Sequence, residues 1–545
     1  MTKKRKYITL AVIVILANLI AHQFQYRWDF TKDQKYSLSK PTKELLANLE
    51  TDIFISVYLT GNLPFDFERL AKETDYFLKE LEAENSRISY RFIDPKGNEE
   101  KLTKQGLAPS RLTVQEDGQV SESIIFPWAV VTANNKIKTV NLLKSSFFEN
   151  ETTQIENSVQ NLEFAFANGI QKATAHKKQK IAVLRGNGEL QDIYQYDWLK
   201  SLGENYFLAP FTLDSITENP QKTLNQLQNF DLTIISKPTE AFTEQEKFAL
   251  DQYTVSGGKT IWLLDLVHTP KDSLMQQGKL LAYQRDLNLT DYLFNYGVRI
   301  NRHLVRDLYA AKIPLATGKV GNNTQFDEFL WDYYPVIKSN NAHVITKNVA
   351  EIKLEFANSI DTLNPNIHKT PLLESSSLTK IQTVPNYVTL ASIAENKGME
   401  SYNQGSKIIG VLLEGNFNSA YKNRVKPFKN NFTIQGKNNK MVVIADGDIS
   451  SNQISKGKPL ELGLDKWTNS YYANKEFLTN TVNYLLNDSG LIQLRAKKVI
   501  IDTINKPKAY AEKTQWQLIN LFAPLLLLAV SGLITFYIRK SKYTA

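Results

Sequence analysis

Carboxylates follow apolar runs of this sequence at the points where the runs end. Asp265 closes one run, and Asp446 and Asp448 directly follow another. Asn187 and Glu189 stand in a glycine turn after a third. If the runs are parallel strands, their carboxyl ends meet at one edge of a sheet, where α/β proteins usually bind ligands. These five residues form the predicted ligand cleft.

Two roles are open for carboxylates that converge there. They could hold a divalent cation through oxygen ligands, or they could cap turns and helices. The six histidines are scattered along the chain and supply no second metal motif. We therefore favour the capping role and expect neither a metal nor a cofactor.

Sequence motifs of common enzymes are missing. The chain has no cysteine, which excludes disulfides, thiolate metal sites and a cysteine nucleophile. It has no Gly-x-Ser-x-Gly elbow and no His-Glu-x-x-His motif. The stretch 257–260 resembles the end of a phosphate-binding loop, but it leads into a strand and not a helix. We expect no ATP hydrolysis and no catalytic residues.

The elements that position the cleft are short apolar runs alternating with helices. Runs at 181–184, 231–235 and 260–265 are typical of parallel strands buried on both faces. Between the last two, Thr243 and Glu246 have capping-box spacing at the start of a helix. This pattern predicts a doubly wound α/β domain of flavodoxin or amidotransferase type.

Later segments are less regular. We expect a helix over 280–297, a glycine-rich loop over 315–323 and a strand over 351–356. Two further buried strands are predicted at 407–414 and 440–445, and a helix at 474–486. The long separation between Asp265 and the strand at 407 implies an inserted subdomain.

An α/β domain precedes this core. Strands at 52–59 and 87–93 flank a helix at 65–83, and a hairpin is predicted from 123–131 and 136–143. The order favours a thioredoxin-like arrangement, without thioredoxin chemistry because no cysteine is present. A helix over 152–174 joins the two domains.

Both ends of the chain carry apolar runs. Tyr7 to Phe24 follows four basic residues, and Trp516 to Ile538 precedes Arg539 and Lys540. Each run is close to the roughly 20 residues that cross a bilayer, and positive flanks stay cytoplasmic. Both termini are therefore expected in the cytoplasm. A cleaved signal peptide is the alternative for the first run.

Part of the net charge of +9 comes from basic residues that cluster in particular segments of the chain. A basic stalk from Lys497 to Lys513 leads to the second apolar run, where lysines suit anionic lipid headgroups better than nucleic acid.

The predicted organisation is an anchor at 1–27, a thioredoxin-like domain at 28–150, a connecting helix at 151–178, an amidotransferase-like domain with an inserted subdomain at 179–495, a stalk at 496–514, a transmembrane helix at 515–539 and a cytoplasmic tail at 540–545.

Several stretches resemble the GldG family, the gliding-motility-associated auxiliary proteins of ABC transporters in the Bacteroidetes. These stretches are 250–253 with 257–259, 296–301, 331–335, 413–417, 445–448, 474–477 and 516–520. Relatives tend to carry Gly-His-Gly-Glu after the first core strand, whereas Asn187 replaces the histidine here.

The resemblance implies a membrane-anchored subunit on the outer face of the bacterial inner membrane. Its partners would be a separate ABC permease and a separate ATPase, and its outer α/β domain would bind substrate or an envelope partner without catalysis. Two alternatives stay open. One is a membrane-bound hydrolase of envelope glycans or peptides that uses Asp265, Asp446 and Asp448, and the other is a structural tether of a motility machine.

Overall fold

A computed structural model describes two parts of the chain. The described residues are 37–486, without 62, 117–118, 135, 145–150, 175–178, 322, 340–341, 364–365, 394–397 and 430–431, together with 506–543. Contacts divide the chain into two units, the larger including Tyr36–Lys497 and the smaller including Lys498–Ala545. The predicted first membrane run, residues 487–495 at the end of the predicted α/β domain and residues 496–505 of the predicted stalk lie outside the described residues.

The amino-terminal domain has a four-stranded mixed sheet with the order β2-β1-β5-β6. The strands are β1 (Ile53–Val57), β2 (Ile88–Phe92), β5 (Trp128–Ala133) and β6 (Lys136–Asn141). β1 and β2 are parallel, while β5 pairs antiparallel with β1 and β6. Its other elements are α2 (Lys40–Ala47), α4 (Glu99–Lys104) and a hairpin of β3 (Ser110–Glu116) and β4 (Gln119–Ile125). The narrower thioredoxin-like assignment stays a prediction.

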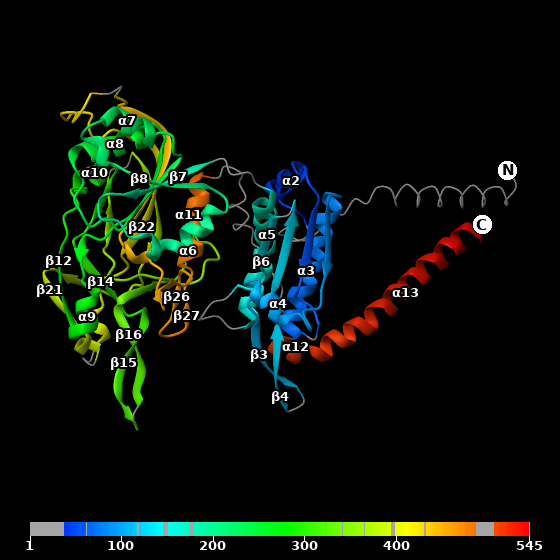
Figure 1. Cartoon of the computed structure of the whole chain (residues 1–545). Helices are drawn as coiled ribbons and strands as arrows, with labels where there is room; N and C mark the ends of the chain where they lie inside the picture. The colour runs from blue at the N-terminus through cyan, green and yellow to red at the C-terminus, as the bar shows by residue number, and fades with distance from the viewer. Residues whose placement is uncertain are drawn as a thin grey trace. The chain divides into compact units, whose positions relative to one another are not determined.

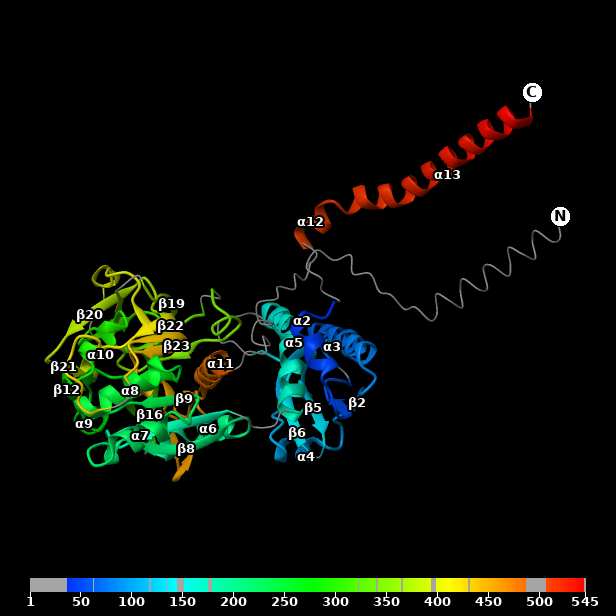
Figure 2. The same ribbon diagram turned by 90° about the horizontal axis from the view of Figure 1, so that it is seen from above.

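Two long helices pack together beside this sheet, as Figure 2 shows. They are α3 (Phe65–Glu84) and α5 (Glu151–Thr174). The apolar stripe of α5, from Ile155 to Ile170, is buried. On α3, Leu78 is buried, whereas Phe77 is half-buried and stacks on Phe166 with ring centroids 5.7 Å apart.

The central sheet has seven strands in the order β19-β22-β23-β10-β9-β7-β8. They are β7 (Lys180–Arg185), β8 (Phe207–Thr212), β9 (Leu232–Ser236), β10 (Lys259–Leu263), β19 (His368–Glu374), β22 (Ile408–Asn418) and β23 (Gln435–Ile444). The five from β23 to β8 are parallel, and β22 and β19 are antiparallel to their neighbours. The fold is mixed α/β, as predicted.

Helices accompany the strands of this sheet. They are α6 (Asp192–Gly203), α7 (Pro220–Leu227), α8 (Glu244–Val255) and α11 (Asn474–Leu486). Helix α8 contacts β10, β22 and β23, and α7 packs against α8, while α6 and α11 contact each other. The predicted capping box is confirmed, because Thr243 Oγ1 accepts from Glu246 N–H at 3.3 Å and Thr243 N–H donates to Glu246 Oε2 at 2.7 Å. The helix predicted over 474–486 is also confirmed.

The predicted helix over 280–297 is wrong. Residues Lys279–Gln284 form strand β12, which pairs with β11 (Val267–His268) and β21 (Asn386–Thr389). Leu280 and Ala282 are buried while Leu281 and Tyr283 are exposed, which is the two-residue period of a half-buried strand. Only the short helix α10 (Thr290–Asn295) follows.

The predicted loop over 315–323 is also wrong. It forms the tip of a long hairpin of β15 (Ala310–Val320) and β16 (Asn323–Ile337), which projects from the domain in Figure 1. The predicted strand over 351–356 shortens to β17 (Ile352–Lys353). Phe356 has a φ of 58°, a conformation that strands do not adopt.

The inserted region contains further short elements. They are α9 (Lys271–Gln277), β13 (Val298–Ile300), β14 (His303–Asp307), β18 (Ile360–Thr362) and β20 (Thr379–Thr383). The turns and two-stranded pairs after β23 are η4 (Asp448–Ser450), β24 (Ile454–Ser455), β25 (Lys458–Pro459), β26 (Leu464–Asp465) and β27 (Ser470–Tyr471).

The smaller unit contains α12 (Lys506–Ala511) and α13 (Lys513–Tyr543). Helix α13 has Pro524 in its interior and is long and apolar enough to cross a membrane. Among the described residues, it is the one helix that is long and apolar enough to do so. Its apolar side chains are exposed.

Candidate functional site

The three predicted aspartates lie together at the carboxyl edge of the central sheet. Asp265 follows β10, and Asp446 and Asp448 follow β23. These strands are parallel neighbours, with Leu263 opposite Ile444. As a result, one carboxylate oxygen from each aspartate lies within 4.8 Å of the others.

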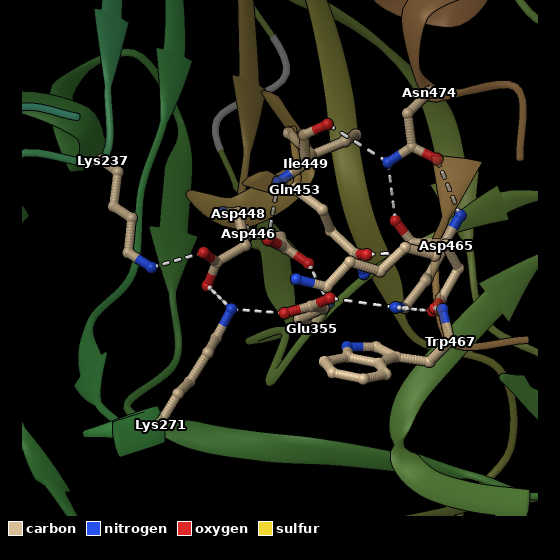
Figure 3. A network of polar contacts seen from close by, with 12 residues as sticks. Lys237, Lys271, Glu355, Asp446, Asp448, Ile449, Gln453, Asp465, Trp467 and Asn474 are labelled. Atoms are coloured by element: carbon tan, nitrogen blue, oxygen red, sulfur yellow. Dashed lines mark hydrogen bonds and ion pairs between the residues drawn. The ribbon is translucent and has the colours of Figure 1, made fainter. Parts of the chain in front are cut away.

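Two lysines contact these carboxylates (Figure 3). Lys237 follows the third parallel strand, β9, and its Nζ lies 2.6 Å from Asp448 Oδ1 and 3.5 Å from Asp265 Oδ2. Lys271, the first residue of α9, places its Nζ 2.9 Å from Asp448 Oδ2 and also pairs with Glu355. Asp448 is thus bridged by two ammonium groups from different parts of the chain.

The network continues into the insertion. Lys353 Nζ lies 3.1 Å from Glu355 Oε1 and 2.8 Å from Asp465 Oδ2. We call the whole set the lysine–carboxylate cluster: Lys237, Asp265, Lys271, Lys353, Glu355, Asp446, Asp448 and Asp465. Its aspartates are all buried.

Backbone N–H groups occupy further carboxylate oxygens. Asp446 Oδ1 accepts from the N–H groups of Asp448 and Ile449 at 2.7 and 3.1 Å, and its Oδ2 accepts from Glu355 N–H at 2.7 Å. Asp265 Oδ1 accepts from Gly447 N–H at 2.6 Å. These bonds hold the turn after β23 against the end of β10.

Burial and neighbouring charges shift the pKa values of three aspartates in the cluster. Burial and the neighbouring Asp265 and Asp448 raise the pKa of Asp446 well above its usual range. Burial also raises the pKa of Asp265, although Lys237 opposes this. The pKa of Asp448 is lowered, because Lys237 and Lys271 outweigh the effect of burial. Five carboxyl groups face three ammonium groups, and burial disfavours the charged form of two of the carboxyls, Asp446 and Asp265.

This arrangement resembles a turn-capping ion-pair network more than an open cation site. A divalent cation prefers several oxygen ligands, but backbone N–H groups and the Lys237 and Lys271 ammonium groups already occupy most of these oxygens. The predicted capping role agrees with this geometry, and the hydrolase interpretation lacks an unpaired carboxylate among the three aspartates.

Asn187 and Glu189 form a second group in the turn after β7. Glu189 Oε2 accepts from Asn187 N–H at 2.9 Å, and Asn187 Nδ2 donates to Glu246 Oε2 at 3.3 Å. Gly188 has a φ of 68°. No hydrogen bond or ion pair of the described residues joins Asn187 or Glu189 to the three aspartates. The structure therefore divides the predicted cleft into two groups.

The two groups share one connecting loop. The N–H groups of Thr239 and Glu240 donate to the Asn187 carbonyl at 2.9 and 3.0 Å, and Lys237 begins the same connection between β9 and α8. Burial raises the pKa of Glu189, and its Oε1 has no hydrogen-bond partner among the described residues. Burial thus disfavours the charged form of the Glu189 carboxyl.

Sequence reasoning did not identify the lysines. Lys237 could have been identified, since it lies two residues after the apolar run 231–235, at the same edge of the sheet as Asp265 and Asp446. Lys271 and Glu355 come from the insertion, and no local pattern marks them. Their place depends on tertiary packing between segments 84 residues apart.

Comparison with known proteins assigns the chain to a family. Residues 178–481 match the family described as ABC-type uncharacterized transport system. The chain belongs to this family. The matched part contains the whole lysine–carboxylate cluster and the turn with Asn187 and Glu189. The predicted ABC transporter relationship is confirmed at this level, and the narrower gliding-motility assignment stays a prediction.

Other parts of this ABC-type transport system protein also have relatives. Residues 32–132 match a domain of unknown function (DUF7088). An uncharacterized protein of Borreliella burgdorferi is 21% identical over 478 residues, which cover 86% of each chain. Among solved structures, the chain is similar to one titled "mmIFT52 N-terminal domain", with 13% identity and a TM-score of 0.32 over 57% of this chain and 98% of that one.

Proposed function

We propose that this protein is a membrane-anchored, non-enzymatic accessory subunit of an ABC transporter. Its outer domains would bind substrate or an envelope partner. The observation that supports this most is α13, whose apolar surface is exposed, in a chain that belongs to a transport-system family. An exposed apolar helix of this length requires lipid or a partner helix to cover it.

The charges at the end of α13 suggest its orientation. Arg539, Lys540 and Lys542 follow its apolar stretch, and positive flanks favour the cytoplasmic side. The carboxyl terminus would then be cytoplasmic and the folded domains would face outward from the bacterial inner membrane. The predicted amino-terminal anchor would place the other terminus in the cytoplasm as well.

The central sheet supports a binding role over a hydrolytic one. Its parallel strands follow the order in which the second strand lies outside the first, as in flavodoxin-type sheets. The carboxylates at the usual ligand-binding edge are paired with lysines and backbone N–H groups. We therefore assign the ATP hydrolysis of the system to a separate ATPase and the membrane pathway to a separate permease.

Co-purification tests this proposal. The affinity-tagged full chain would be extracted in mild detergent and its partners identified by mass spectrometry, beside a variant that lacks residues 513–545. The full chain should carry a permease and an ATPase, and the truncated chain should lose both. Recovery of the full chain alone, in a detergent that keeps the permease and ATPase together, would contradict the proposal.

The resemblance to the GldG family adds a narrower proposal, that the complex serves gliding motility. Deletion of the gene should then stop surface spreading of the source bacterium, and the full chain should restore it. Normal spreading of the deletion strain would reject the motility role and leave the transporter role unaffected.

A further inference from the structure

A polar pocket of about 410 Å³ lies at the opposite edge of the central sheet from the lysine–carboxylate cluster. Strands β22 and β23 are antiparallel, with Gly410 opposite Ile444 and Asn418 opposite Gln435. Asn418 therefore lies beside the start of β23, whereas Asp446 follows its end. We call this the amide pocket; its lining includes Asn295, Asn416, Asn418, Asn423, Lys422 and Arg424.

A buried carboxylate fixes one wall of the amide pocket. Asp251 of α8 is fully buried. Its Oδ1 accepts from Ala420 N–H at 2.8 Å and from the Tyr296 hydroxyl at 2.7 Å, and its Oδ2 accepts from the Ser419 hydroxyl at 2.5 Å. The turn that follows β22 is thus held at Ser419 and Ala420 by hydrogen bonds to the buried Asp251. Lys422 and the residues directly after it face the solvent.

The pocket combines amides with cations. Asn416, Asn418 and Lys422 are exposed, and no described residue forms an ion pair with Lys422. Arg424 pairs with Asp291, which leaves other N–H groups of its guanidinium available, since this group has five. None of the lining residues is acidic, so an anionic ligand would meet no carboxylate there.

These groups define a ligand class. An asparagine amide both donates and accepts, which matches a hydroxyl group that does the same. Lysine and arginine form charge-assisted hydrogen bonds with carboxylate or phosphate. The volume falls in the range of about 300–1,000 Å³ typical of small-molecule sites, but the wall is polar and not apolar. Saccharides are small ligands whose surface is mostly hydroxyl.

We propose that the amide pocket binds an acidic saccharide, with its hydroxyl groups on the asparagines and its anionic group on Lys422 and Arg424. This deepens the proposed function by naming a ligand class for the outer domain. It also places ligand binding away from the carboxyl edge, where the lysines already neutralise the aspartates.

Saturation-transfer NMR on the full chain tests the pocket, in a detergent without a sugar headgroup. The probes are glucuronic acid and glucose, with inorganic phosphate as a competitor. The variants are Lys422→Glu and Asn418→Ala, and the control is Lys458→Glu, an exposed lysine on β25. Equal unfolding temperatures of the variants and the control would show that the fold is retained.

We expect a glucuronic acid signal for the unmodified chain and for Lys458→Glu. Glucose should bind about tenfold more weakly, since an anionic contact is lost. Lys422→Glu should abolish the signal and Asn418→Ala should weaken it.

Three results would overturn the proposal. They are an unchanged signal in both pocket variants, equal binding of glucose, and absence of binding by glucuronic acid. Displacement by equimolar phosphate would also overturn it, because the pocket would then recognise an anion and not a sugar. Co-purification with a permease does not depend on this experiment, so the two proposals can fail separately.

Discussion

The two edges of the central sheet use polar residues in opposite ways. At the carboxyl edge, Lys237 and Lys271 pair with Asp448 inside the domain. At the other edge, Asn418 and Lys422 face solvent beside a cavity. The difference shows that the usual ligand-binding position of an α/β sheet can be used to fix the fold. A buried polar network costs desolvation unless its members are paired, whereas exposed amides can exchange water for a ligand.

Breaking a pair at the carboxyl edge should have the largest effect. Lys237→Met leaves Asp448 and Asp265 without one ammonium group. Removal of one partner from a buried pair costs about 3–5 kcal/mol, and we expect the lower end because the Lys237 side chain is 21% exposed. Chemical denaturation of the detergent-solubilised full chain measures the free energy of unfolding.

Two further variants test the interpretation of that loss. Lys458→Met, at an exposed lysine, should change the free energy of unfolding by less than about 0.5 kcal/mol. The double variant Lys237→Met with Asp448→Asn should be more stable than Lys237→Met alone, since it removes a buried carboxylate charge that has lost one of its two ammonium partners. A double variant that is less stable than the single one would contradict the ion-pair explanation.

The turn after β7 should be the next most sensitive position. A Cβ atom on Gly188 would lie 2.1 Å from Thr239 Oγ1, and its φ of +68° disfavours other residues. We expect Gly188→Ala to lower the free energy of unfolding by about 2–3 kcal/mol. Gly457→Ala is the matched control, because Gly457 has a φ of +73° with no atom within 4 Å of the added Cβ. Equal losses in both variants would show that the contact with Thr239 has no effect.

The pH dependence of the free energy of unfolding should reveal the raised pKa of Asp265. Burial raises the pKa of Asp265, so its contribution to stability is full below the unfolded pKa of about 3.9 and is lost as the pH rises through the folded pKa. Asp265→Asn removes this titration. The free energy of unfolding of the variant minus that of the unmodified chain should therefore be larger at pH 8 than at pH 4. A constant difference would contradict the raised pKa.

The sequence predicted the parallel core because its strands are buried on both faces. Ile181 to Leu184 and Ile261 to Leu264 are continuous apolar runs, and the capping box at Thr243 depends on residues only three apart. Such local patterns can be recognised in a single sequence. The edge strand β8 (Phe207–Thr212) was missed, since it is largely exposed and contains Pro210, which edge strands tolerate.

The insertion was harder to predict because its strands pair over long distances. Strand β12 pairs with β21 (Asn386–Thr389), more than 100 residues later, and the apolar residues of 280–297 also fit a helical pattern. The same reason explains why only part of the candidate site could be predicted from the sequence. Parallel strand ends bring Asp265 and Asp446 together predictably, whereas Lys271 and Glu355 reach Asp448 only through the packing of the insertion.

The amide pocket had a partial signal in the sequence. Asn416, Asn418 and Asn423 lie close together after a buried run, but asparagines are also common in turns. Only the fold brings Asn295 beside them, where its Nδ2 donates to the Asn418 carbonyl at 3.0 Å. Clusters of exposed amides therefore need a cavity beside them before they predict a site.

Loss of the helix cap should have a smaller effect than the changes at the carboxyl edge. Thr243→Ala removes the hydrogen bond from Glu246 N–H, and N-cap substitutions of this kind cost about 1 kcal/mol. Thr243→Ser retains the hydroxyl and should restore most of the stability. If serine were no better than alanine, the side-chain oxygen would not be the stabilising group.

Stability should change least at the amide pocket, which sharpens the comparison between the edges. Lys422 and Asn418 are exposed, so Lys422→Glu and Asn418→Ala should each change the free energy of unfolding by less than about 0.5 kcal/mol. Denaturation under the conditions used for Lys237→Met provides the measurement. A loss as large as that of Lys237→Met would mean that the pocket residues hold the fold together, and the two edges would then differ in exposure but not in role. A small change in the free energy of unfolding, together with a lost glucuronic acid signal, would separate ligand binding from stabilisation of the fold. The same substitution would then leave the fold intact while it removed a ligand contact.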